Sequence, residues 1–174
     1  MRHPLLLGLG ALGLLLVPGR AQAQWSVRLA LEAPLYAHAS VSGQSSSFGI
    51  NESFQPTLDL IGSYVLGDSL SLDLEFRRGI AATGTGFTRQ QTFIGPGLTL
   101  DVLTFPLYGR VALPIQVEGG TVLFLRFGGG LKILDWGFFR VYFEVTADLA
   151  CAGSGVSFLG SQAVNAAVGA WLRF

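Results

Sequence analysis

The chain has few of the residues that usually hold metals, form disulfides or act as catalytic bases. Its 174 residues include one cysteine and two histidines. One cysteine cannot form a disulfide within a single chain, and a zinc site needs more cysteine and histidine than this. We therefore expect no metal and no cofactor.

Charge is also scarce, and no membrane helix is encoded after residue 23. The chain has 11 basic and 11 acidic residues and no basic stripe, so we expect no nucleic-acid partner. No later apolar run approaches the ~20 residues that a spanning helix needs. Since half of the residues are nevertheless hydrophobic, their placement needs another explanation.

The first 23 residues have the pattern of a cleavable export signal. Arg2 precedes an apolar run over residues 5–17, and Ala21-Gln22-Ala23 is a small-residue cleavage site. We expect a secretory signal peptide over 1–23, cut between Ala23 and Gln24, and one domain over 24–174. Cleavage removes two arginines, which leaves nine basic against eleven acidic residues.

Residues 69–76, SLSLDLEF, alternate strictly between polar and apolar side chains. In a β-strand, successive side chains point to opposite faces, so this segment has one polar and one apolar face. A soluble barrel would bury the leucines, whereas a membrane barrel would turn them outward into lipid.

The same alternation recurs along the mature chain and predicts an all-β fold of eight antiparallel strands in an up-and-down transmembrane barrel. The expected strands cover residues 25–36, 54–66, 69–77, 90–102, 107–118, 121–133, 138–151 and 163–174. Long connections at 37–53, 78–89 and 152–162 alternate with short turns near 67–68, 103–106 and 134–137, as in outer-membrane barrels. The short link at 118–120 departs from this alternation.

Every charge in these predicted strands falls on the polar parity. A basic residue at a bilayer midplane costs about 2–4 kcal/mol, which would enforce such an exclusion from the lipid face. We expect the charged side chains to form a polar network in the lumen: Arg28, Glu32, Asp59, Asp73, Glu75, Arg77, Asp101, Arg110, Glu118, Arg126, Lys132, Arg140, Glu144, Asp148 and Arg173.

Two further features favour a membrane barrel over a lipocalin-like one. Glycines share the polar face with bulky aromatic residues, which suits a crowded lumen. Aromatic residues also cluster at the strand ends that would face the periplasm, which predicts an interfacial girdle of Trp25, Tyr64, Phe105 and Trp136, with Phe174 at the same rim.

The last strand, AVNAAVGAWLRF, ends on Phe174, with Leu172, Ala170 and Val168 at alternate positions before it. It resembles the C-terminal signal by which the barrel-assembly machinery recognises bacterial outer-membrane proteins. With the export signal and eight strands, the mature chain resembles the small OmpA/OmpX-type barrels over its full length. This resemblance implies an integral protein of the Gram-negative outer membrane that contacts outer-membrane lipid and lipopolysaccharide. We expect a monomer.

Prolines 34, 56, 96 and 114 lie within predicted strands, although proline cannot donate to a ladder. Three of them fall toward outer strand ends, where a bulge is tolerated. Pro96 has only its neighbours Gly95 and Gly97 to permit a local kink.

An eight-stranded barrel is just wide enough for side chains to fill it. We therefore expect a salt-bridged plug, with a structural or surface-interaction role carried by the long external loops and an unknown surface ligand. A narrow channel for small solutes is the alternative, and a soluble periplasmic lipocalin-like binding barrel is another.

A lipid A-modifying enzyme is a further alternative. Barrels resembling the lipid A deacylases use a His-x-Ser pair with a carboxylate, and His38-Ala39-Ser40 is the only such pair here, with Glu32 as the one evident acid. A nucleophilic serine needs a base within hydrogen-bond reach and a group that orients the base. The motif is short, so we expect no enzymatic activity.

Overall fold

The described part of the computed structural model contains ten strands and no helix. It covers residues 24–41, 44–49, 56–66, 69–80, 91–102, 105–118, 120–153 and 156–174, so the expected signal peptide, with Ala23, lies outside it. The strands are β1 (Gln24–Val41), β2 (Gln44–Gly49), β3 (Thr57–Val65), β4 (Leu70–Gly79), β5 (Thr92–Asp101), β6 (Leu107–Ala112), β7 (Ile115–Gln116), β8 (Val122–Asp135), β9 (Phe139–Gly153) and β10 (Val156–Arg173). Within these ranges, no helix could span a bilayer.

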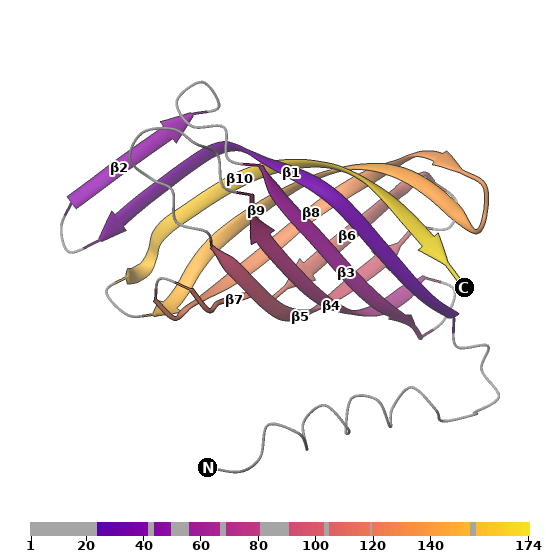
Figure 1. The fold of residues 1–174 in the computed structure, drawn as a ribbon, viewed down its shortest axis with the longest axis horizontal. Coiled ribbons are helices and arrows are strands. Elements are labelled where there is room, and N and C mark those ends of the chain that lie inside the picture. Colours follow the sequence, from indigo (N-terminus) through magenta and orange to yellow (C-terminus); the bar gives the residue numbers. More distant parts are fainter. Residues whose placement is uncertain are drawn as a thin grey trace, which may run out of the picture.

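The strands close into an eight-stranded barrel (Figure 1). Each wall strand pairs antiparallel with its neighbour in the sequence, and β10 pairs with β1 to complete the ring. β6 and β7 are two halves of one wall strand, since both pair with β5 and β8. β2 pairs with β1 in a hairpin. The predicted eight-stranded, all-β, up-and-down barrel is confirmed.

Apolar side chains cover the outer wall of the barrel, and polar side chains fill its interior. On β4, Leu74 is 59% exposed, whereas its neighbours Asp73 and Glu75 are 6% and 0% exposed. The same alternation holds along the other wall strands. A soluble lipocalin-like barrel would require the opposite arrangement, so that alternative is wrong. The leucines of residues 69–76 face outward, as a transmembrane barrel requires.

Two prolines explain why the predicted strand 107–118 is split. Leu113 N donates to Pro96 O at 2.9 Å, and Phe124 N donates to Pro114 O at 2.9 Å. In each pair, the proline accepts one ladder hydrogen bond and cannot return the second, because it has no N–H. The strand is therefore interrupted at residues 113–114, where Pro96 of β5 faces Leu113.

The other two prolines lie at irregular or terminal positions of their strands. Pro34 borders a register shift in the pairing of β1 with β10. Pro56 precedes β3, and its carbonyl accepts from Ile80 N at 2.8 Å. At both positions, the missing proline N–H therefore interrupts no regular stretch of the hydrogen-bond ladder.

Two of the predicted long loops are largely strands, which corrects the sequence analysis. β1 continues to Val41 and forms a hairpin with β2, so most of 37–53 is extended. β10 begins at Val156, so most of 152–162 belongs to that strand. These extensions lie beyond the charged lumen, contain no Asp, Glu, Lys or Arg, and are rich in Ser. They lack the two-faced pattern that marks the membrane-spanning parts. The loop 78–89 lies mostly outside the described residues.

β4 and β8 are also longer than predicted, which places two charges outside the lumen. Arg78 lies on the outward parity near the end of β4, and Asp135 is exposed at the end of β8. Both are at strand ends, where the cost of a charge near the lipid is small. The exclusion of charge therefore applies to the central part of the wall.

Candidate functional site: the barrel interior

Most of the charged residues that the sequence assigns to the lumen are buried inside the barrel. Six are basic and seven are acidic: Arg28, Arg77, Arg110, Arg126, Lys132 and Arg140, with Glu32, Asp59, Asp73, Glu75, Asp101, Glu144 and Asp148. Two of the predicted set are placed differently. Glu118 is exposed and accepts a 2.8 Å hydrogen bond from Thr92 Oγ1, and Arg173 is only half-buried near the end of β10.

Arg126 of β8 is the centre of the network. Its Nη1 donates to Glu75 Oε1 at 2.6 Å, and its Nη2 donates to Glu32 Oε2. Its Nε lies 3.0 Å from Asp148 Oδ1. These three carboxylates come from β4, β1 and β9, so one guanidinium joins widely separated parts of the wall across the lumen.

Arg110 and Arg77 extend the network in both directions. Arg110 Nη2 donates to Glu75 Oε2 at 2.5 Å, and its Nη1 donates to Glu144 Oε1 at 3.3 Å. Arg77 Nη1 donates to Asp148 Oδ2 at 2.7 Å and to Glu32 Oε1 at 3.0 Å. Buried ions are tolerated only when they are paired and hydrogen-bonded, and this arrangement meets that condition for the carboxylates of Glu32 and Glu75.

A second layer of ion pairs lies closer to the rim that carries Gln24 and Phe174. Arg28 Nη2 donates to Asp73 Oδ2 at 2.6 Å and to Thr99 Oγ1 at 2.8 Å. The Arg28 guanidinium carbon lies 4.7 Å from the ring centroid of Trp171. Nearer the rim, Asp101 accepts from Lys132 Nζ and, at 3.0 Å, from Arg140 Nη1.

Aromatic residues fill the lumen on both sides of the central ion pairs. Toward the rim with Phe174, the rings of Tyr108, Tyr142 and Trp171 pack edge to face. At the opposite end, Phe93 and Phe124 pack together at 5.7 Å between centroids, with Val122 and Ala150. The central ion pairs, those of Arg77, Arg110 and Arg126, therefore lie between two aromatic clusters.

Inward glycines make room for the tyrosine rings. A Cβ on Gly130 would lie 2.3 Å from the Tyr108 ring, and a Cβ on Gly169 would lie 2.7 Å from the Tyr142 ring. Tyr108 Oη then donates to Glu144 Oε2 at 2.6 Å, which ties this aromatic cluster to the ion pairs.

Asp59 is the exception among the buried acids. Its Oδ2 lies 3.6 Å from Nη1 of both Arg110 and Arg126, beyond hydrogen-bond distance. Its Oδ1 has no hydrogen-bond partner within the described residues. Because the buried set holds seven acids and six bases, Asp59 is the carboxylate that the network compensates least.

The structure does not assemble the candidate catalytic residues into a triad. Glu32 is buried in the lumen, where it accepts from Arg77 and Arg126. His38 lies on the outer part of β1, and its Nδ1 is 2.8 Å from Ser47 Oγ of β2. Glu32 is thus engaged elsewhere, and the described hydrogen bond of His38 goes to Ser47 and not to Ser40.

The four predicted girdle residues lie at one end of the barrel. Trp25 packs against Tyr64 with 4.9 Å between ring centroids, and Trp136 stacks on Phe139 at 5.7 Å. Phe105 and Trp136 are exposed. Phe138 is exposed in the same turn as Trp136 and was missed in the sequence analysis, although its place in a short turn beside Trp136 could have indicated it.

The residues of the predicted assembly signal lie at the closing seam of the barrel. Leu172, Ala170 and Val168 pair with Val27, Leu29 and Leu31 of β1. Phe174 N donates to Trp25 O at 2.8 Å. Val168, Leu172 and Phe174 are exposed on the outer wall. Recognition of this segment by assembly machinery stays a prediction.

Known proteins resemble this chain in fold. The crystal structure of Neisserial surface protein A (NspA) aligns over 86% of this chain and 97% of its own, with 13% identity and a TM-score of 0.55. A de novo designed transmembrane β-barrel aligns over 86% of this chain and 95% of its own, with 9% identity and a TM-score of 0.47. No family model and no curated protein matches the sequence. The likeness to NspA shows a shared eight-stranded barrel fold.

Removing Arg126 should destabilise the barrel far more than removing the charge of Asp59. Arg126→Met leaves several buried carboxylates with fewer partners, and breaking a buried ion pair in this way costs about 3–5 kcal/mol. Asp59→Asn removes a carboxylate that lies 3.6 Å from its nearest guanidinium nitrogens, and it leaves six buried acids against six buried bases. Urea unfolding of the refolded barrel in vesicles measures both.

Asp148→Asn is the matched control for Asp59→Asn. Asp148 accepts from Arg77 at 2.7 Å and from Asn165 at 3.0 Å, so the same change should cost more there. Equal losses for the two asparagine variants would contradict the network described above.

Proposed function

We propose that this protein is an integral outer-membrane barrel whose lumen is plugged by its own side chains, and that it acts through its outer end in a structural or surface-interaction role. The observation that carries the proposal is the ion-pair network across the lumen. A water-filled pore would need a path past Arg126, Glu75 and the apolar clusters on either side.

At the proposed outer end, strand segments extend past the part of the wall that closes the barrel. The β1–β2 hairpin projects beyond the wall (Figure 1), and residues of β10 pair with the same part of β1. This extension, formed by residues 37–41, 44–49 and 156–162, supports a surface for lipopolysaccharide or another ligand outside the cell. The exposed aromatic girdle at the opposite rim suits the periplasmic interface.

The plug predicts that the folded barrel does not conduct ions. Planar-bilayer recordings with heat-modifiable, correctly folded protein should show no steady single-channel conductance. A control recording uses the double variant Arg126→Ser and Glu75→Ser, which removes one central ion pair and tests whether the assay can detect an opened lumen. The variant is used only if its mobility on a gel still changes on boiling, which shows that it is folded. Steady openings of the unmodified protein would replace the plug with the channel alternative.

The orientation predicts which turns are accessible on intact cells. An epitope tag inserted between Val41, the last residue of β1, and Gln44, the first residue of β2, should be labelled by antibody on whole Gram-negative cells. A tag inserted at Gly137, between Trp136 and Phe138, should be labelled only after the outer membrane is permeabilised. The reverse pattern would invert the proposed orientation, and labelling of neither site would argue against insertion in the outer membrane.

A further inference from the structure

Three glycines of the described wall have outward parity, and at two of them, Gly62 and Gly109, a side chain would have open space. They are Gly62 on β3, Gly109 on β6 and Gly129 on β8. A Cβ on Gly62 or Gly109 would meet nothing within 4 Å, and a Cβ on Gly129 would meet only Tyr108 O at 3.1 Å. The inward-facing Gly128 and Gly130 have no room for a side chain, since a Cβ at either position would lie 2.3 Å from its nearest neighbour.

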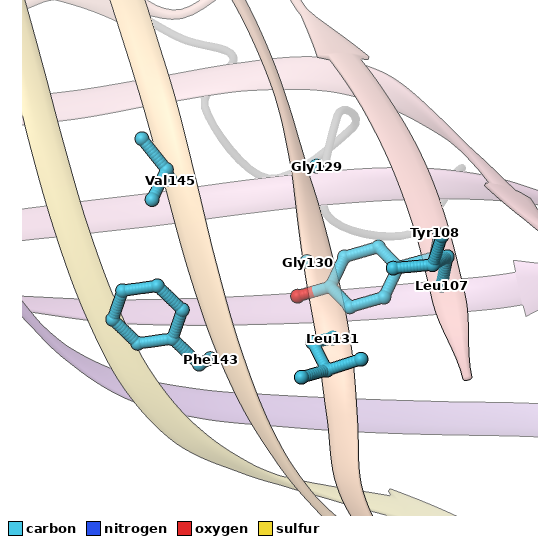
Figure 2. A pocket seen from close by; sticks show the side chains of 7 residues that line it. All are labelled: Leu107, Tyr108, Gly129, Gly130, Leu131, Phe143 and Val145. Carbon is cyan, nitrogen blue, oxygen red and sulfur yellow. The ribbon is translucent and has the colours of Figure 1, made fainter.

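Two of these outward glycines are directly opposite each other, and one of them, Gly129, lines a hollow in the wall. Gly109 and Gly129 are cross-strand partners in the β6–β8 pairing. Beside Gly129 lies an open hollow of about 400 Å³, bordered by Leu107, Leu131, Phe143 and Val145. Figure 2 shows the Tyr108 ring beside Gly130, so this ring borders the hollow together with the apolar wall residues.

The position of the hollow along the barrel axis can be estimated from its distance to the strand ends. Leu107 is the first residue of β6, and Leu131 lies four residues before the end of β8, about 13 Å along a strand at ~3.3 Å per residue. The hollow therefore lies in the half of the apolar wall that is nearer to the aromatic rim. In the proposed orientation, this half faces the periplasmic leaflet, which is made of phospholipid.

The surroundings of the hollow indicate what fills it. Its border is apolar, and it is continuous with the outer wall that contacts hydrocarbon. A lipid chain gains no hydrophobic free energy by moving from the bilayer to such a wall. A chain in the hollow, however, makes van der Waals contacts on several sides, and these contacts are lost if the hollow stays empty. No charged residue lines the hollow, and the hydroxyl of its one tyrosine, Tyr108, donates to Glu144, so the hollow offers little to a polar protein partner.

We propose that the hollow beside Gly129 is a binding site for one acyl chain of a phospholipid of the periplasmic leaflet. This proposal rests on the proposed membrane orientation. The chain lies over Gly129 between Leu131 and Phe143, where it exchanges more slowly than chains on the rest of the wall.

Photolabelling tests the site. The protein is refolded into phosphatidylethanolamine and phosphatidylglycerol vesicles that contain a minor fraction of phospholipid with a diazirine on one acyl chain. After irradiation, mass spectrometry of peptides should find adducts enriched at Leu131, Phe143 and Val145 over wall residues of the opposite side, such as Leu60 and Leu74.

Substitutions that fill the hollow supply the decisive comparison. Gly129→Leu should reduce labelling at Leu131 and Phe143 several-fold. Gly109→Leu is the second variant, because Gly109 is the cross-strand partner of Gly129 and a Cβ there meets no neighbour, whereas a Cβ on Gly129 lies 3.1 Å from Tyr108 O. Gly62→Leu is the matched control, since it adds the same side chain to an outward glycine elsewhere on the wall. It should leave the labelling of the hollow unchanged.

The outcomes separate this proposal from the proposed function. Uniform labelling around the wall, or labelling at the hollow that the filled variants do not change, would overturn the acyl-chain site and leave the membrane barrel intact. Peptide-to-peptide crosslinks at Leu131 or Phe143 between two copies would also overturn it, in favour of self-association. Absence of labelling anywhere on the wall would contradict membrane insertion itself.

Discussion

Hydrocarbon solvates neither a charge nor an unpaired backbone amide, and the architecture of this barrel follows from that constraint. Closure of β10 onto β1 removes the sheet edges that lipid could not satisfy. Because successive side chains of a strand point to opposite faces, every charged side chain of the central wall points inward. Leu74 and Glu75 are adjacent in sequence, yet Leu74 is exposed on the outer wall and Glu75 is buried in the lumen. The cost of lipid contact thus concentrates the ionisable groups in a narrow space, and this forces them to pair with one another.

The crowded lumen links the fold to the proposed role. Arg126 and Glu75 connect distant wall strands, while Tyr108 and Tyr142 pack against glycines that leave room for their rings. The proposed plug would leave the outer end and the lipid-facing wall as the places where the barrel can interact. The hairpin of β1 with β2 and the hollow beside Gly129 lie on these surfaces.

The sequence predicts the wall of the barrel well, because one face of each strand meets lipid and the other meets charge. Residues 69–76 show this contrast in every position. The pattern fails where that contrast ends. The extensions of β1 and β10 contain no Asp, Glu, Lys or Arg and lack the two-faced pattern, so the sequence predicts loops there. Parity also indicates which charges point inward, but not their partners. Two examples are Asp59, whose Oδ1 has no hydrogen-bond partner among the described residues, and Glu32, which pairs with Arg126. Both depend on how strands that are distant in sequence meet across the lumen.

The most direct test of the inside-out arrangement is a scan of spin labels along β4, from Leu70 to Arg77, in a Cys151→Ser background. In vesicles, oxygen dissolved in the bilayer should relax labels at positions 70, 72, 74 and 76 strongly, and labels at the intervening positions weakly. An alternation of two residues in that phase is the expected result. The opposite phase, with oxygen reaching the positions of Asp73 and Glu75 in preference to those of Leu72 and Leu74, would contradict the account.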